Sequence, residues 1–438
     1  MSRKLIMAIV ALSFVFTGAA FAAVENIKVS GDIGEQYLVR DFTMGASTDG
    51  DDSDHQGIFS QIRLRFDADL TEGVSATVRL LNERLWGVED GFNDTESFNL
   101  DLGYIELKEF LYQPLTMIIG RQNLRYGNAL IIGDPDTNQT AAGETPSLVG
   151  DLSWKKSFDA ARAVLDFSPY TIDVIYARLD ENLTGYRDEQ NIYGVYGTYD
   201  WSSYNGVTEA YFIGADNSDG GTWTEKKERT YTVGARAQMD PNDHITLGLE
   251  GAWQFGNDAV ASDDNRSRRA YATQLLTEYR FLNKYNAKVG IDFTYLSGDK
   301  GKTTGRTESW DPLYEDQTPG ELVNILFANT NLLLPGFKVS MMPREDLTLN
   351  LRYVHARYAR KVASDTYEPT KGPSYGESYS VDRNKKYLGD EVDFGATYDY
   401  TEDVQFNLSG ALFMPGAYFK STHDNTSYSV RGGVTVNF

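Results

Sequence analysis

Alternation of apolar and polar residues is the feature that most constrains the fold of this chain. The C-terminal segment carries Tyr428, Val430, Val434, Val436 and Phe438 on one face, with small or polar residues at the intervening positions. A period of two is typical of β-strands. A strand with one apolar and one polar face separates lipid from a water-filled lumen in membrane barrels. The pattern therefore predicts a membrane-spanning strand that ends on an aromatic residue.

The same alternation recurs along the chain, in segments 58–69, 74–80, 231–239, 245–255, 287–295, 347–353, 392–400 and 404–412. Short turns such as 71–73, 241–243, 283–285, 344–346 and 401–403 separate long polar stretches at 43–56, 128–151, 257–268, 297–321 and 361–386. In outer-membrane barrels the short turns are periplasmic and the long loops are extracellular. We therefore predict an all-β, antiparallel, up-and-down transmembrane barrel of about 18 strands, with about 16 as the alternative because segment 186–215 is ambiguous.

A soluble two-sheet sandwich also alternates, so composition has to separate the two folds. The chain has 28 Tyr, 22 Phe and 6 Trp, which make 13% aromatic residues. Aromatic residues lie near the ends of the apolar faces, while the opposite faces carry charges in mid-strand. This distribution is typical of interfacial aromatic girdles around an aqueous channel, and it favours the barrel.

The N-terminus has the organisation of a secretory signal peptide. Arg3 and Lys4 form a basic region, residues 5–16 an apolar core, and Ala20-Phe21-Ala22 a small-residue cleavage site. The alternative, an anchor helix, needs about 20 apolar residues. We expect a signal peptide at 1–22, a barrel at 23–438 and secretion to the outer membrane, where the aromatic residue Phe438 resembles the signal that the barrel assembly machinery recognises.

Composition argues against several other classes of function. The chain has no cysteine, which excludes disulfides and thiolate chemistry, and its net charge of −22 disfavours nucleic acid as a partner. The four histidines His55, His244, His355 and His423 form no Ser–His–carboxylate set at a recognisable spacing. We therefore predict no enzyme, no cofactor and no metal site. The acidic run 49–54 fits a solvated loop better than a calcium site.

Charged residues on the polar faces are the candidates for function. The arginines predicted to line the lumen are Arg63, Arg65, Arg79, Arg121, Arg162, Arg236, Arg352 and Arg431; Arg280 falls on the same pattern. The carboxylates predicted to face them are Asp32, Asp67, Asp69, Asp101, Asp166, Asp173, Glu250, Glu278, Asp292, Glu391 and Asp393. Arginine binds carboxylates in a bidentate way and stays charged, so this set suits a carboxylated polymer. The alternative is that these ion pairs only brace the barrel.

Two long loops, 128–151 and 297–321, are long enough to fold into the channel. Within the second region, Thr318-Pro319-Gly320-Glu321 precedes the apolar run 322–327. This sequence fits a short helix with proline in its first turn, and it fits the start of a strand equally well.

Several segments resemble the bacterial alginate export family of outer-membrane barrels. The most specific is the hairpin containing Gly389-Asp390-Glu391-Val392-Asp393 and ending at Phe413-Met414-Pro415-Gly416. Segments 120–127, 132–134 and 158–162 are similar to further family elements, although Pro135-Asp136-Thr137 stands where the family carries a tryptophan. The resemblance implies an 18-stranded barrel and places Arg121 and Arg162 on the lumen wall.

Three functions follow as hypotheses. The first is passive export of an anionic, alginate-like polysaccharide, with outer-membrane lipid around the barrel and periplasmic export proteins as possible partners. The second is a general or nutrient-specific porin for small solutes, including small anions. The third is an outer-membrane hydrolase, which the four histidines support poorly.

Overall fold

A computed structural model gives the fold of residues 26–42, 55–87, 98–136, 149–181, 189–201, 203–218, 228–259, 265–300, 305–363, 366–367 and 378–438. The expected signal peptide at 1–22 and the acidic run 49–54 lie outside these described residues. No helix in the described ranges combines the length and apolar character needed to cross a membrane.

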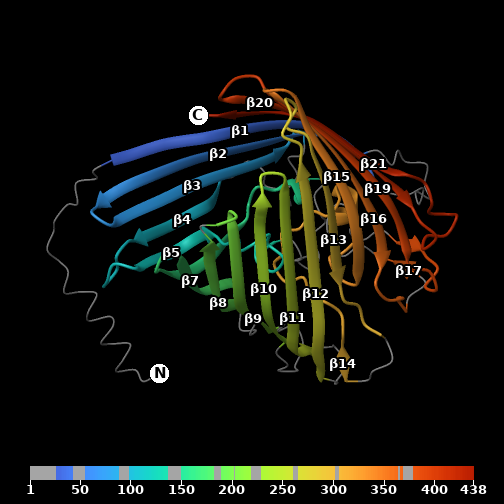
Figure 1. The fold of residues 1–438 in the computed structure, drawn as a ribbon, viewed down its shortest axis with the longest axis horizontal. Helices are drawn as coiled ribbons and strands as arrows, with labels where there is room; N and C mark the ends of the chain where they lie inside the picture. Colours follow the sequence, from blue (N-terminus) through green and yellow to red (C-terminus); the bar gives the residue numbers. More distant parts are fainter. Residues whose placement is uncertain are drawn as a thin grey trace.

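The described residues form a closed antiparallel barrel of 18 strands (Figure 1). These strands are β1 (Asn26–Asp41), β2 (His55–Thr71), β3 (Val74–Leu85), β4 (Asn99–Leu107), β5 (Leu115–Asn123), β6 (Ser157–Asp166), β7 (Tyr170–Glu181), β8 (Glu189–Trp201), β9 (Gly206–Ser218), β10 (Glu228–Asn242), β11 (Ile245–Ala259), β12 (Asn265–Arg280), β13 (Lys288–Leu296), β15 (Leu332–Arg344), β16 (Leu347–Tyr358), β19 (Tyr387–Asp399), β20 (Val404–Pro415) and β21 (Ser427–Asn437).

Each strand of the ring pairs with the next, and β21 pairs with β1 to close it. The prediction of about 18 strands is therefore confirmed, and the ambiguous region 186–215 contains the two strands β8 and β9. Three short strands lie outside the ring. β14 (Arg306–Thr307) adds to β12 in parallel, and β17 (Thr366–Tyr367) pairs with β18 (Tyr379–Ser380).

The connections alternate in length as the sequence predicts. The turns at 72–73, 243–244 and 345–346 are two residues long, whereas segments 124–156, 297–331 and 359–386 join strands at the opposite end. We refer to the first end as the turn end and to the second as the long-loop end.

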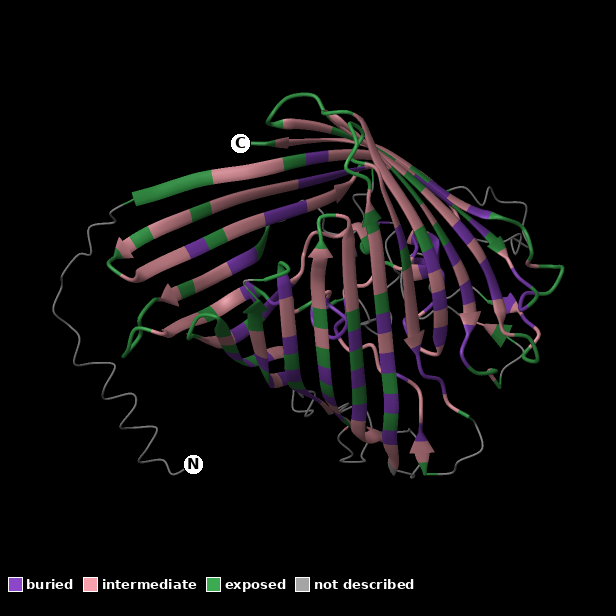
Figure 2. Ribbon diagram, in the orientation of Figure 1, coloured by how far each residue is buried: buried purple, intermediate pink, exposed green. Residues whose placement is uncertain are grey.

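The apolar positions of the alternation face outward. Leu249, Trp253 and Ile291 are 56%, 51% and 59% exposed, while the intervening Glu250 and Gln254 are buried. Figure 2 shows this alternation of exposed and buried residues along β10, β11 and β12. Lipid takes the place of water at these outer positions.

Two helical segments lie in the connections: the 3₁₀ helix η1 (Gly150–Leu152) and the α-helix α2 (Glu321–Leu326). Of the two alternatives left open for residues 322–327, a short helix or the start of a strand, the structure has the helix, α2. However, Pro319 precedes its N-cap, Gly320, and so does not lie in its first turn.

Candidate functional site

Two segments fold into the long-loop half of the lumen and cover its wall. We call residues 124–136 and 305–331 the inner segments. They pair with each other, since Gly133 N–H donates to Tyr314 O at 2.8 Å and Asp316 N–H donates to Ala129 O at 3.0 Å. The expectation that loops 128–151 and 297–321 enter the channel is thus met by their described parts.

Inward-facing side chains of the wall hold the inner segments in place. Gln254 of β11 clamps the backbone of Asp311, donating to its carbonyl at 2.7 Å and accepting from its N–H at 2.9 Å. Glu391 of β19 accepts the N–H groups of Leu322 and Val323, in the first turn of α2, at 2.7 and 2.6 Å. These contacts satisfy backbone groups that would otherwise be buried without partners.

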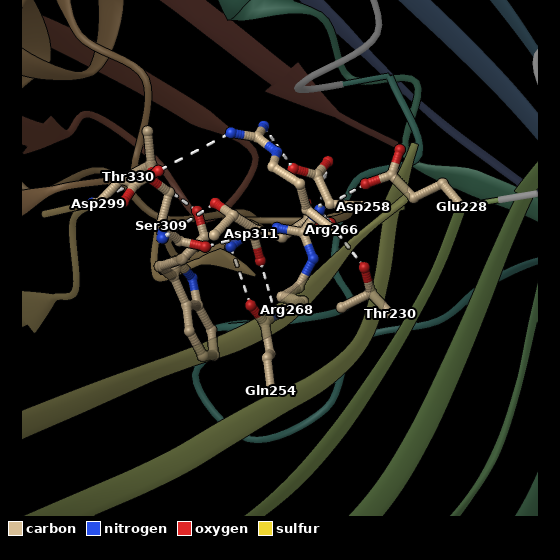
Figure 3. Close-up of polar contacts among 12 residues, drawn as sticks. Glu228, Thr230, Gln254, Asp258, Arg266, Arg268, Asp299, Ser309, Asp311 and Thr330 are labelled. Carbon is tan, nitrogen blue, oxygen red and sulfur yellow. Dashed lines mark hydrogen bonds and ion pairs between the residues drawn. The ribbon is translucent and has the colours of Figure 1, made fainter. Parts of the chain in front are cut away.

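A polar cluster at the long-loop end ties the second inner segment to β10, β11 and β12 (Figure 3). Arg268, 7% exposed, lies 3.4 Å from Asp258 and 3.5 Å from Asp311, and it also pairs with Glu228. Arg266 pairs with Asp258 at 2.8 Å. The adjoining cavity of about 500 Å³ is lined by these two arginines and by four carboxylates, those of Glu228, Asp258, Asp299 and Asp311. Its charge balance disfavours anions.

A second cavity lies against the inner segments and has the opposite charge balance. It measures about 470 Å³ and carries four cations, Arg125, Arg236, Lys338 and Arg352, against three carboxylates, Glu250, Asp292 and Asp316. A neighbouring cavity of about 350 Å³ shares Thr318, Lys338 and Arg352 with it. We call the cavity of about 470 Å³ the cationic cavity. It brings together two of the arginines predicted from sequence, Arg236 and Arg352.

Every one of the eight predicted arginines has a carboxylate partner. The distances in parentheses join a guanidinium nitrogen to a carboxylate oxygen. The partners are Asp32 for Arg63 (2.8 Å), Asp67 for Arg65 (2.7 Å), Asp101 for Arg79 (2.5 Å), Asp159 for Arg121 (2.6 Å), Asp173 for Arg162, Glu209 for Arg236, Asp292 for Arg352 (2.8 Å) and Glu321 for Arg431 (2.8 Å). Several of them stay accessible, with 35% of the Arg65 side chain and 30% of the Arg352 side chain exposed. The wall is a set of ion pairs rather than a ladder of free cations.

The position of Arg121 differs from the sequence-based expectation. The strand register puts Arg121 in one row with residues of the neighbouring strands, which share its face of the sheet: Val78, Gly103, Asp159 and Arg178. Val78 is 41% exposed on the outer face, as is Ile119 two positions before Arg121, at 50%. The register therefore directs Arg121 outward. Ile118 and Ile119 are both apolar, so the sequence at this point does not show which residues of β5 face inward.

The remaining seven arginines share the inner face with buried neighbours. Arg63, Arg65 and Arg79 form one group on β2 and β3, where Arg65 and Arg79 lie opposite each other. Trp154 covers the Arg63 guanidinium at 4.3 Å, and Tyr126 covers that of Arg162 at 5.5 Å. Arg431 lies apart from this group, next to α2.

Sequence reasoning missed several charged residues of the lumen. Arg40 is fully buried and pairs with Asp151 at 2.7 Å, and its distance to Glu321 is 3.7 Å. Arg40 follows Gln36 and Leu38 at alternate positions, and this pattern is the signal that predicts an inward-facing side chain. Arg125 and Lys156 come from connections, and both contact Asp316. No periodic pattern marks residues of this kind.

Lys156 anchors the two inner segments to each other. Its ammonium lies 2.6 Å from Asp316 and 3.3 Å from Asp134. Burial alone would lower the pKa of Lys156, but the two carboxylates outweigh it and raise that pKa above its ordinary value. Burial also raises the pKa of Asp134. Among the described residues no group of three or more His, Asp or Glu is arranged to hold a metal ion.

The sequence profile of the alginate export family matches residues 26–432, nearly the whole chain. The chain belongs to this family. No curated relative matches it. The family and the fold support an outer-membrane channel.

Solved structures with the same fold include outer-membrane porins of Pseudomonas aeruginosa. OccK2 (OpdF), determined in complex with glucuronate, is 11% identical, with a TM-score of 0.58 over 95% of this chain and 98% of its own. OccK11 (OpdR) is 9% identical, with a TM-score of 0.57 over 95% of this chain and 96% of its own. At this identity the likeness concerns the fold alone.

Proposed function

We propose that this outer-membrane channel exports an anionic polysaccharide of the alginate-like uronate type by passive electrodiffusion. The observation that carries the proposal is the cationic cavity, in which Arg125, Arg236, Lys338 and Arg352 face one volume beside the inner segments. Membership of the alginate export family supports the same cargo. Arg63, Arg65, Arg79, Arg162 and Arg431 continue the polar wall on either side.

Paired arginines suit a polymer that must move on after it binds. A uronate carboxylate offers the same two oxygens as Asp292, so it exchanges with Asp292 on the partly exposed guanidinium of Arg352. Partly exposed ion pairs contribute only about 0–1 kcal/mol each, so this exchange costs little. Conduction needs binding that is favourable enough for entry and weak enough for release.

The test is reconstitution in a planar bilayer, with reversal potential measured in a salt gradient before and after addition of oligouronates. We expect anion preference and a reversible block by oligouronates but not by neutral oligosaccharides. The variant Arg236→Gln with Arg352→Gln is expected to weaken both the preference and the block. Arg344→Gln with Lys108→Gln removes the same charge from exposed sites near the turn end, where the side chains are 66% and 65% exposed, and serves as the control.

Two results would contradict the proposal. One is cation preference without block in the native channel. The other is an equal response of the lumen variant and the control, which would assign Arg236 and Arg352 to bracing of the barrel.

The second candidate is a porin for small solutes, and the inner segments favour it because they narrow the lumen. The structural neighbour OccK2 was solved with glucuronate, a single uronic acid. Monomeric glucuronate and oligouronates of increasing length separate the two functions. A block that tightens with chain length supports export of a polymer, whereas equal block by the monomer supports the porin.

Delivery to the membrane forms part of the proposal. Residues 1–22 would direct secretion, and Phe438 would be recognised by the barrel assembly machinery. Deletion of Phe438 should lower the yield of folded barrel in the outer membrane, measured by resistance to denaturation in unheated detergent extracts. Periplasmic export proteins would supply the polymer at the turn end.

A further inference from the structure

The long-loop end of the barrel carries a group of cations outside the lumen. Arg357, Arg360, Lys361, Lys385 and Lys386 lie where β16 ends and β19 begins. We call them the rim cations. We propose that the rim cations and the outward-facing side chains below them bind the phosphate groups of a phosphorylated lipid in the outer leaflet.

The rim cations differ from the luminal arginines in having no carboxylate partner. Across the described residues no ion pair joins any of the five to Asp or Glu. Lys386 donates to the carbonyl of Ala359 at 2.7 Å, which leaves its charge uncompensated. In a chain of net charge −22, five cations without a carboxylate partner among the described residues suit an anion from outside the chain.

Asp390, an outward carboxylate on β19, is already engaged. Asp390 accepts hydrogen bonds from the hydroxyl groups of Tyr353 at 2.8 Å and Tyr387 at 2.5 Å. His355 Nδ1 also lies 2.8 Å from it. With three partners on its two oxygens, Asp390 is not available to neutralise the rim cations.

The direction of these side chains selects a lipid over a soluble anion. Arg357 follows Tyr353 and His355 at alternate positions of β16, and Tyr353 is 40% exposed on the outer face. The His355 ring stacks on Tyr387 at 5.0 Å between centroids. Aromatic residues of this kind occupy the level of the lipid headgroups. An anion that meets Arg357 there lies in the plane of the membrane.

Four of the rim cations, Arg357, Arg360, Lys361 and Lys386, are close enough to affect one another. Burial lowers the pKa of Lys386, and the charges of Arg357, Arg360 and Lys361 lower it further. A bound phosphate would relieve this repulsion. Arginine and lysine donate well to phosphate oxygens, and basic residues at a membrane surface attract anionic lipid headgroups.

The experiment uses the full-length barrel in detergent, titrated with diphosphorylated lipid A and, in parallel, with dephosphorylated lipid A. Retained lipid is counted by native mass spectrometry. The test variant is Arg357→Gln, Lys361→Gln and Lys386→Gln together. The control, Lys108→Gln, Lys284→Gln and Arg344→Gln, removes three exposed charges near the turn end. Neither variant alters a residue placed in the lumen.

We expect the native barrel and the control to prefer the diphosphorylated lipid. We expect the test variant to lose affinity for it by about 100-fold, because each basic residue at an anionic surface contributes about five-fold. Equal retention of the two lipids by the native barrel would overturn the proposal, as would equal affinity of the two variants.

A soluble oligouronate tests the alternative, that the rim cations bind a soluble polyanion instead of a lipid. If it displaces the lipid from the native barrel and binds the test variant more weakly, the rim binds soluble polyanions, and the lipid assignment is wrong. Loss of lipid binding with an unchanged oligouronate block in bilayers would instead support the lipid assignment independently of the proposed cargo.

Discussion

The turn half and the long-loop half of the lumen differ in what covers the inward-facing side chains of the wall. In the turn half, the inner wall is polar and accessible, with pairs such as Arg63–Asp32 and Arg65–Asp67 facing water. In the long-loop half, inward positions such as Ala177 and Ile192 are apolar and fully buried, because the inner segments cover them. Inward side chains of the turn half are therefore polar and wet, whereas those of the long-loop half are apolar or, like Gln254 and Glu391, hydrogen-bonded to the inner segments.

The difference has an energetic side as well. Polar contacts of the turn half are partly solvated and replaceable, whereas those of the long-loop half are buried and carry the full cost of an unpaired group when broken. We expect substitutions in the two halves to differ accordingly, in three ways.

The largest effect is expected at Glu391. Replacement by Ala leaves the N–H groups of Leu322 and Val323 buried without acceptors, at about 1–3 kcal/mol each, so α2 should detach from the wall. Single-channel conductance should rise, and protease should cleave within 321–326. Glu278→Ala is the matched change in the turn half, since its partners Lys288 and Lys338 lie 3.5 and 3.6 Å away and stay solvated. Equal conductance changes in the two variants would mean that buried contacts of the long-loop half matter no more than solvated contacts of the turn half.

A smaller effect is expected from removal of one cation in each half. Arg40→Met breaks a buried pair with Asp151 and should lower the free energy of unfolding by about 3–5 kcal/mol. Arg65→Met breaks a pair that is about one-third exposed and should cost about 0–1 kcal/mol. Urea unfolding of the barrel in lipid vesicles measures both. Similar losses would mean that burial does not decide the strength of these pairs.

The smallest effect is a dependence on pH that belongs to the long-loop half alone. Because the pKa of Lys156 is raised in the folded protein, its ammonium stabilises the inner segments fully below the ordinary value of 10.5, and this stabilisation is lost as the pH rises through the raised value. Current fluctuations should therefore increase above pH 10.5. Lys156→Gln should show no such transition; a transition that survives in this variant assigns it to another group.

The sequence predicts the strands well because most positions on their outer face are apolar. Alternation such as that of Leu249 and Trp253 with Glu250 and Gln254 depends only on lipid outside and polar groups inside. Where both faces of a strand are apolar, the sequence no longer shows which residues point inward and which point outward. The run Val174-Ile175-Tyr176-Ala177 has Val174 and Tyr176 exposed and Ile175 and Ala177 buried. Such continuous apolar runs mark the places where a segment folds into the lumen.

The candidate site was only partly predictable for the same reason. Arg236 and Arg352 alternate with outward apolar neighbours and fall where the pattern puts them. Arg121 follows Ile118 and Ile119, where the pattern gives no phase. Arg125 and Lys156 contribute through long-range contacts with Asp316 that no local period encodes.

Closure of the barrel links the two ends of the chain directly. Gly31 N–H donates to Phe438 O and Phe438 N–H donates to Gly31 O, each at 2.9 Å. The Phe438 ring also lies against Gly31, where an added Cβ would meet it at 2.6 Å. The ring of strands is thus complete only when β21 and Phe438 meet the start of β1. Until that contact forms, the sheet has two open edge strands whose N–H and C=O groups lack partners, so an unfinished barrel is open to pairing with other chains.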